Sequence, residues 1–186
     1  MKKVILPGFL ALLSMPVVAH PGGHHAMGFG AGIVHPLSGL DHALLLVAAG
    51  AWLALQKHNT ALAAAAMMLS ALVLGILCGI LLGGFNLEPA IMATLLVVAA
   101  ALALARRESL LLVASILTAA GLIHGWVHGA ELNSAGAHFG VGLVLGSALI
   151  LSLSTLGFGL IQRYLRAHWV RLAGVSAALV GLFISI

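Results

Sequence analysis

Charged residues are scarce in this sequence. Asp, Glu, Lys and Arg make up 6% of its 186 residues, while hydrophobic residues make up 62%. Soluble globular domains carry roughly 25% charged residues, so this composition excludes a soluble globular protein. The Lys and Arg residues are scattered in short hydrophilic breaks and form no basic patch, which argues against nucleic acid as a partner despite the net charge of +4. We expect the chain to lie in a lipid bilayer.

Cysteine is nearly absent, and the chain has neither a phosphate-binding loop nor room for a second domain. Cys78 is the single cysteine, which excludes a disulfide framework. The sequence contains no GxxxxGK[ST] motif, so nothing in it suggests a pump driven by ATP. Membrane spans of about 20 residues each would use up the chain after six or seven crossings. A single membrane domain is therefore expected.

The first 19 residues have the pattern of a secretory signal peptide. Lys2 and Lys3 precede a short apolar stretch, and small residues end at Ala19. We expect a cleavable signal peptide over residues 1–19 and a membrane domain over residues 20–186 that begins on the outer face. The alternative is an uncleaved anchor helix, which the short apolar run and its two prolines disfavour.

Hydropathy predicts an all-α polytopic membrane protein with six transmembrane helices. The apolar stretches cover residues 28–55, 61–83, 89–105, 110–131, 138–161 and 168–186. If the mature chain begins outside, its loop lysines and arginines all fall on the cytoplasmic side, as the positive-inside rule requires. Glycines four residues apart, such as Gly121, Gly125 and Gly129, would let helix backbones approach closely in lipid.

The first predicted helix contains the polar sequence HPLSGLDH. His35 and His42 are seven residues apart and would lie near one face of a continuous helix, about 10 Å apart along its axis, with Asp41 beside them. Pro36 is expected to kink this helix, and Ser38 is expected to bond back to its own helix. An acid at mid-bilayer costs about 2.5–3.5 kcal/mol, and no Lys or Arg is expected nearby to pair with Asp41. We therefore expect ligand or proton-relay roles for the two histidines and the aspartate.

A second polar cluster, IHGWVHGAE, ends the fourth predicted helix. His124, His128 and Glu131 stand at positions i, i+4 and i+7 and share one helix face. Two histidines one helical turn apart are a common metal chelate. We expect these three residues to be ligands or proton carriers, with a solvated helix end as the alternative for Glu131.

Further histidines fall on the predicted outer side. His20, His24 and His25 lie in the mature N-terminal sequence HPGGHH and could capture an external cation, or belong to a tail without a role. His138 begins the fifth predicted helix and could close the outer mouth of a path, or simply lie at the membrane interface. The sequence leaves these alternatives open.

Imidazole and carboxylate without thiolate favour divalent nickel, cobalt, zinc or copper over magnesium or calcium. Copper(I) is less favoured because Met67, Met68 and Met92 sit in apolar runs, where core packing is their expected role. Ligand type alone does not select nickel over zinc. A shared site further requires the first and fourth helices to be neighbours, with His35 and His124 facing each other at similar depth.

The two motifs together resemble the signatures of the HupE/UreJ family of small membrane proteins, HPxxGxDH and HGxxHGxE. The resemblance implies a secondary permease, not an enzyme, in the inner membrane of a bacterium. Its cargo would be nickel, sometimes cobalt, for the maturation of hydrogenase or urease. It implies no prosthetic group, and it leaves open whether the chain forms a homo-oligomer. The functional positions it implies are His35, Asp41, His42, His124, His128 and Glu131.

Two functions of different classes follow from these residues. A permease would pass the cation from outer ligands to a site at Asp41 and His42. A zinc-dependent membrane hydrolase, similar to alkaline ceramidases, would use three histidines to hold zinc, with Asp41 or Ser38 assisting attack by a metal-bound water on a lipid amide or ester. The hydrolase requires a cleft that faces the lipid. We favour the permease; a metal sensor or storage protein is a third, weaker reading.

Overall fold

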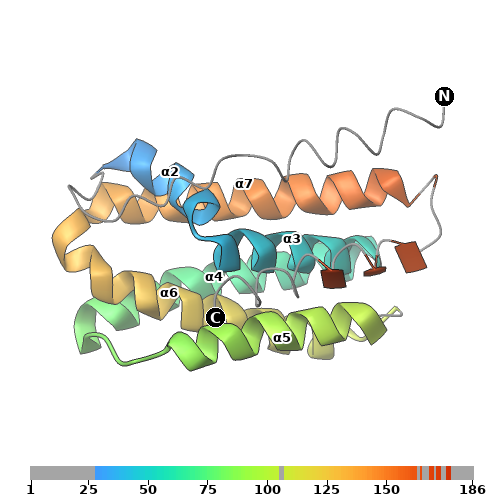
Figure 1. Ribbon diagram of the computed structural model, residues 1–186, viewed down its shortest axis with the longest axis horizontal. Helices are drawn as coiled ribbons and strands as arrows, with labels where there is room; N and C mark the ends of the chain where they lie inside the picture. The colour runs from blue at the N-terminus through green and yellow to red at the C-terminus, as the bar shows by residue number, and fades with distance from the viewer. Residues whose placement is uncertain are drawn as a thin grey trace.

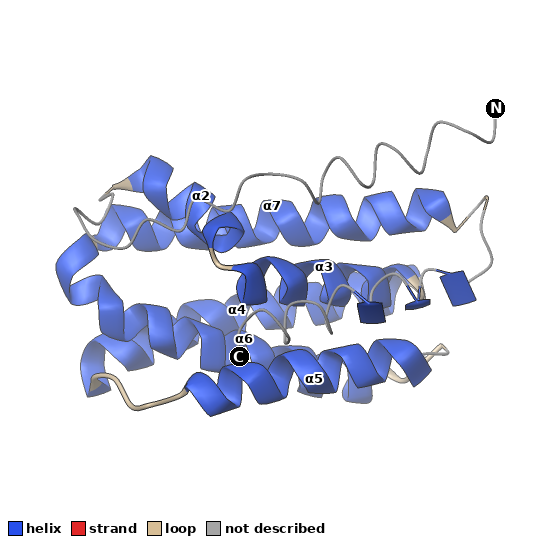
Figure 2. Ribbon diagram, viewed as in Figure 1, coloured by secondary structure: helices blue, strands red, loops and turns tan. Residues whose placement is uncertain are grey.

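The computed structural model describes residues 28–104, 107–162, 164, 168, 169, 171, 172, 175 and 176. These residues form helices and contain no strand, as Figure 2 shows. The all-α class is therefore confirmed for the described part of the chain. The predicted signal peptide, the tail histidines His20, His24 and His25, and most of the sixth predicted span lie outside it.

The helices lie side by side in an elongated bundle (Figure 1). Their bounds are α2 (Phe29–Ser38), α3 (Leu40–Ala54), α4 (His58–Leu82), α5 (Glu88–Leu104), α6 (Leu110–Ala135) and α7 (Ala137–Ile161).

Helices α4, α6 and α7 are each long and apolar enough to cross a membrane, and α2 with α3 adds a fourth crossing if the pair is one span. Helix α5 is apolar but shorter, at 17 residues. Large apolar side chains cover the outside of the bundle, and Leu81 and Leu111 are each 79% exposed. Extensive apolar surface of this kind is unusual on a soluble monomer. The chain is a multi-pass membrane protein.

The first predicted span is broken rather than continuous. Helix α2 ends at Ser38, α3 begins at Leu40, and the two are bent by 79°. Pro36 lies inside α2, so the disruption expected at the proline occurs at Gly39 instead. The Ser38 hydroxyl donates to the His35 carbonyl at 2.7 Å, which confirms the expected bond back to its own helix. Such a bond competes with regular helix hydrogen bonding and accompanies the end of α2.

Glycines bring α4 and α6 into close contact. A Cβ atom added at Gly125 would overlap the carbonyl oxygen of Leu72, and one at Gly129 would overlap that of Ile76. Residue numbers rise together along this interface, so the two helices run parallel. The expectation that glycines four apart allow close backbone approach is confirmed here. The glycines in this interface are Gly75, Gly79, Gly121, Gly125 and Gly129.

Helix α7 packs against both halves of the broken span. A Cβ atom at Gly32 of α2 would overlap the carbonyl oxygen of Phe139, and one at Gly146 of α7 would overlap that of Ile33. Further along, a Cβ atom at Gly50 of α3 would lie 2.5 Å from the Cβ of Ser154. The contact therefore continues past the bend, and α7 supports α2 and α3 on either side of it.

An apolar core fills the bundle between the bend and the far end of α3. Trp52 is fully buried there with Leu95 and Leu117, which come from α5 and α6. The Trp52 indole nitrogen has no hydrogen-bond partner within the part of the chain that the structure describes. Beyond this core, Gln162 donates to the Ala54 carbonyl at 2.9 Å, closing the end of α3.

Candidate functional site

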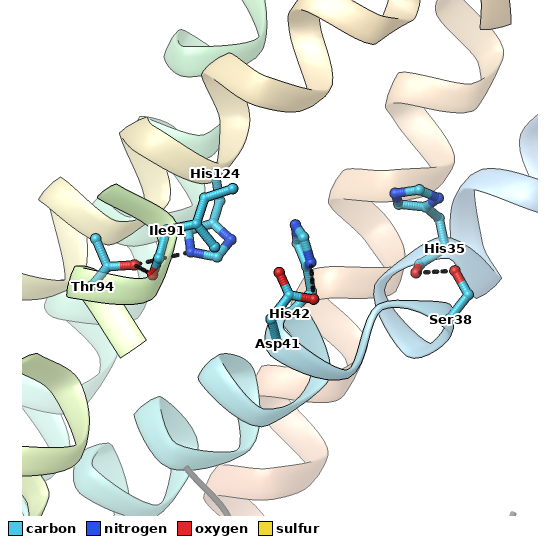
Figure 3. A network of polar contacts seen from close by, with 7 residues as sticks. All are labelled: His35, Ser38, Asp41, His42, Ile91, Thr94 and His124. Atoms are coloured by element: carbon cyan, nitrogen blue, oxygen red, sulfur yellow. Dashed lines mark hydrogen bonds and ion pairs between the residues drawn. The ribbon is translucent and has the colours of Figure 1, made fainter. Parts of the chain in front are cut away.

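Four predicted site histidines meet beside the bend. His35 comes from α2, His42 from α3, and His124 and His128 from α6. The centroid of the His42 ring lies 4.6 Å from that of His128, 4.9 Å from that of His124 and 6.3 Å from that of His35. Figure 3 shows His42 between His35 on one side and His124 on the other. We call these four residues the histidine cluster.

The pairing within the cluster differs from the sequence-based expectation. His35 was expected to face His124, but its ring lies against His128, with centroids 4.8 Å apart, while His124 lies against His42. The expectation that His35 and His42 share one face of a continuous helix is also wrong. Both differences have the same cause, because the 79° bend turns α3 away from α2 and carries His42 toward the middle of α6.

His42 is the cluster member with unmet hydrogen-bonding capacity. Both of its ring nitrogens are buried, and neither has a hydrogen-bond partner among the described residues. The Asp41 carboxylate lies 2.9 Å from Nδ1 of His42, an ion-pair contact whose angle does not make an aligned hydrogen bond. Leaving a buried polar group unsatisfied costs about 1–3 kcal/mol. The His42 ring is therefore a group that a ligand would stabilise.

Asp41 does have a partner, although none was expected. The expected absence of a partner concerned lysine and arginine, whereas the contact comes from the neighbouring His42. Side-chain exposures of 21% for Asp41 and 16% for His42 place the pair at the edge of the buried region.

Gly39 provides the space that this pair occupies. A Cβ atom at Gly39 would lie 2.9 Å from Nδ1 of His42 and 3.0 Å from the Asp41 carboxylate. Its φ of −94° and ψ of 116° are extended values that any residue adopts. Glycine is needed here for room, not for backbone freedom.

A small cavity of about 20 Å³ adjoins three histidines of the cluster. His42, His124 and His128 line it, together with Met68 of α4 and Ser147 of α7. A cavity needs roughly 10–15 Å³ to hold one water molecule, so this one accommodates about one particle of that size. Met68, expected to serve in core packing, is 3% exposed and also forms part of the cavity wall.

Sequence reasoning missed several residues that contact the histidine cluster. The Thr94 hydroxyl of α5 lies 3.0 Å from Nε2 of His124, and the Phe139 ring lies 5.1 Å from that of His35. Thr94 could have been noticed as a polar residue in the otherwise apolar run of α5. Ser147 and Phe139 carry no such local signal, because only the packing of α7 brings them to the site.

The rings do not yet form a metal-ligand set. Within the described residues, no three His, Cys, Asp or Glu side chains are placed to hold one ion together. His42 and His124 meet nearly edge to face, at an interplanar angle of 84°. Nitrogen–metal bonds are about 2.0–2.1 Å long for zinc. Shared coordination by His42 and His124 would therefore require their rings to turn.

The described structure does not place the other predicted site residues in the histidine cluster. His138 is exposed at the start of α7. The backbone of Glu131 belongs to α6, but its side chain lies outside the described structure, as do the tail residues His20, His24 and His25.

Comparison with known proteins extends over nearly the whole chain. Residues 9–184 match the family model described as HupE / UreJ protein. The chain is also 36% identical, over 182 residues, to Protein HupE of Rhizobium leguminosarum bv. viciae, and the match covers 92% of each protein. No solved structure matches. The matched region includes both histidine motifs. The chain therefore belongs to the HupE/UreJ family.

Proposed function

We propose that this protein is a permease that carries a divalent transition-metal ion, in the first place nickel, across the inner membrane of a bacterium. The observation that carries the proposal is the His42 ring, with two buried nitrogens that lack hydrogen-bond partners among the described residues. Three further imidazoles surround it beside a small cavity. Intramembrane ionisable groups are costly and mark ion paths in membrane proteins.

The chemistry of the cluster suits a first-row divalent ion. Neutral imidazole binds nickel, zinc, copper and iron, whereas magnesium and calcium prefer oxygen ligands. A divalent charge in a low-dielectric interior also needs a compensating negative charge. Asp41 supplies one beside His42, at 2.9 Å from its Nδ1. Ligands must be deprotonated to bind a metal, so protonation of the histidines or of Asp41 at low pH would oppose binding of the ion.

The broken span supports a transport role. Secondary transporters place their substrate sites at discontinuous helices near the middle of the membrane. Here the break at Gly39 lies between His35 and His42, so both cluster residues flank it. The cation would reach this break from the outer face, with His138, the tail histidines and Glu131 as earlier ligands.

Release on the cytoplasmic side requires a change in shape. The apolar core around Trp52 lies between the cavity and the far end of α3. A hydrated or partly hydrated ion would not enter such a layer unaided. We expect α3 to move against α5 and α7 about the bend, opening a path past Trp52. Nickel delivered in this way would serve enzymes such as hydrogenase or urease.

The alternative hypothesis, a zinc-dependent membrane hydrolase, has less support. It needs a lipid amide or ester to reach a metal-bound water, which requires a cleft much larger than one water molecule. The cavity beside the histidines measures about 20 Å³. A substrate of that class would not fit unless the bundle opened widely.

Uptake of nickel into proteoliposomes tests the proposal. We expect saturable accumulation that cobalt inhibits and magnesium does not, and a loss of at least about tenfold in His42→Ala because the central ligand is removed. His58→Ala, at an exposed position that begins α4, is the matched control and should transport normally. Accumulation no greater than in protein-free vesicles would refute the permease. Turnover of ceramide by the same sample, lost with chelator and restored by zinc, would favour the hydrolase.

A further inference from the structure

Helix α5 contributes one polar side chain to the histidine cluster. Its buried face is otherwise apolar, with Ile91, Leu95 and Val98 among its members. Thr94 is 9% exposed and lies on this face. Its hydroxyl oxygen is 2.7 Å from the Ile91 carbonyl oxygen and 3.0 Å from Nε2 of His124. Figure 3 marks both contacts with dashed lines.

The two contacts of this hydroxyl determine where the protons lie. A hydroxyl has a single hydrogen, and a carbonyl oxygen can only accept. The short contact with Ile91 therefore uses the Thr94 hydrogen. The Thr94 oxygen can then only accept from His124, so Nε2 of that ring carries a hydrogen and donates it. In the neutral ring, the unprotonated nitrogen is Nδ1.

We propose that Thr94 is a positioning residue that holds His124 in the tautomer with hydrogen on Nε2, so that Nδ1 is the nitrogen presented to the cation. The role toward the cation rests on the proposed permease function, whereas the tautomer does not. Hydrogen bonds of this kind set the tautomer and ring orientation of metal-binding histidines.

The position of the ring supports this assignment. His124 is 4% exposed and lines the cavity with His42 and His128. Its Nε2 is hydrogen-bonded to Thr94 of α5. The ring can therefore offer only Nδ1 to the cavity. A histidine whose hydrogen were on Nδ1 would face Thr94 with two acceptors and no hydrogen between them.

Nitrogen NMR of histidine-labelled, metal-free protein in nanodiscs tests the tautomer directly. The His124 signals are assigned by their loss in His124→Gln. We expect a single pattern with hydrogen on Nε2 in the wild type and in Thr94→Ser, which keeps the hydroxyl. Thr94→Val has a similar shape but no hydroxyl, and it should lose this pattern.

Thr155→Val is the matched control. The Thr155 hydroxyl likewise donates to a carbonyl of its own helix, that of Leu151, at 2.8 Å. Its removal should leave the His124 signals unchanged. A wild-type His124 with hydrogen on Nδ1 would overturn the proposal, as would an unaltered pattern in Thr94→Val.

Calorimetric titration with nickel tests the consequence for the cation. Loss of the hydrogen-bond partner of a metal-binding histidine typically weakens metal binding by about 10–100-fold. We expect a loss in this range for Thr94→Val, with Thr94→Ser and Thr155→Val near the wild type. Wild-type affinity in Thr94→Val would overturn the role toward the cation. If the wild type bound no nickel at all, the permease proposal would fail, while the NMR result would still decide the tautomer.

Discussion

At the scale of single residues, the site depends on how three neighbours share a small space. Gly39 leaves room, Asp41 provides a negative charge, and His42 projects into the cluster with its ring nitrogens unsatisfied among the described residues. The contact between Asp41 and His42 joins adjacent residues at the start of α3, in the space beside Gly39. The motif GLDH thus supplies the space at Gly39 as well as the candidate ligands Asp41 and His42.

Gly39→Ala should weaken nickel binding without straining the backbone. The new Cβ atom would stand 2.9 Å from Nδ1 of His42 and 3.0 Å from the Asp41 carboxylate, so that pair must shift. We expect affinity, measured by titration with nickel, to fall by about tenfold, in line with loss of ligand support. Gly30→Ala, in α2, is the control, because nothing described lies within 4 Å of its added Cβ. Equal affinities for the two variants would contradict this account.

At the scale of helices, two parallel pairs form the frame around the site. Helices α4 and α6 approach through glycines, as do α2 and α7. The first pair places His124 and His128 around the same cavity as Met68, and the second holds the His35 ring against that of Phe139. Close packing of small residues is a main source of helix association in lipid. The positions of the site histidines therefore depend on these two helix interfaces.

Gly125→Leu should destabilise the protein more than a glycine substitution on the outer face. Even a Cβ atom at Gly125 would overlap the Leu72 carbonyl oxygen, so α4 and α6 would have to separate. Overpacking costs roughly 1–3 kcal/mol, and occasionally more. Thermal unfolding in detergent should show a lower midpoint for this variant. Gly159→Leu on α7 meets nothing described within 4 Å of its Cβ and should unfold near the wild-type temperature. A similar loss in both variants would count against the interface.

At the scale of the whole molecule, the bundle places the histidine cluster and the Trp52 core in succession along α3. Lys57 and Arg107, two of the basic residues predicted to be cytoplasmic, lie in the loops beyond the core, on the far side from the bend. This arrangement gives the proposed path an entry at the histidines and a closed apolar layer toward the cytoplasm.

Reporter fusions test the predicted orientation. Alkaline phosphatase, which needs export to become active, should be active when fused after Phe85 and inactive when fused after Lys57. The reason is that basic loops are retained in the cytoplasm. Fluorescent protein fusions at the same two positions should give the complementary result. Activity of the phosphatase after Lys57 would reverse the proposed direction of entry.

The membrane class, the helical spans and both motifs could be predicted from the sequence because they are local properties. Apolar content over about 20 residues identifies a crossing, and the spacing of His124 and His128 places them on one helix face wherever the helix lies. The two motifs likewise indicated the family that the comparison then confirmed. The signal peptide and the six crossings stay predictions.

Tertiary structure alone decided which of these residues meet. The 79° bend at Gly39 brings His42 to His124 and leaves His35 with His128, an outcome that helix periodicity could not reveal. The tertiary structure also brings Thr94 of α5 to His124. The physical reason is that spacing along one helix determines a face, whereas contacts between helices depend on how closely distant backbones can pack. In this protein that closeness is set by glycines such as Gly32, Gly125 and Gly129, which stand close to the histidines in sequence but pack against the backbones of other helices.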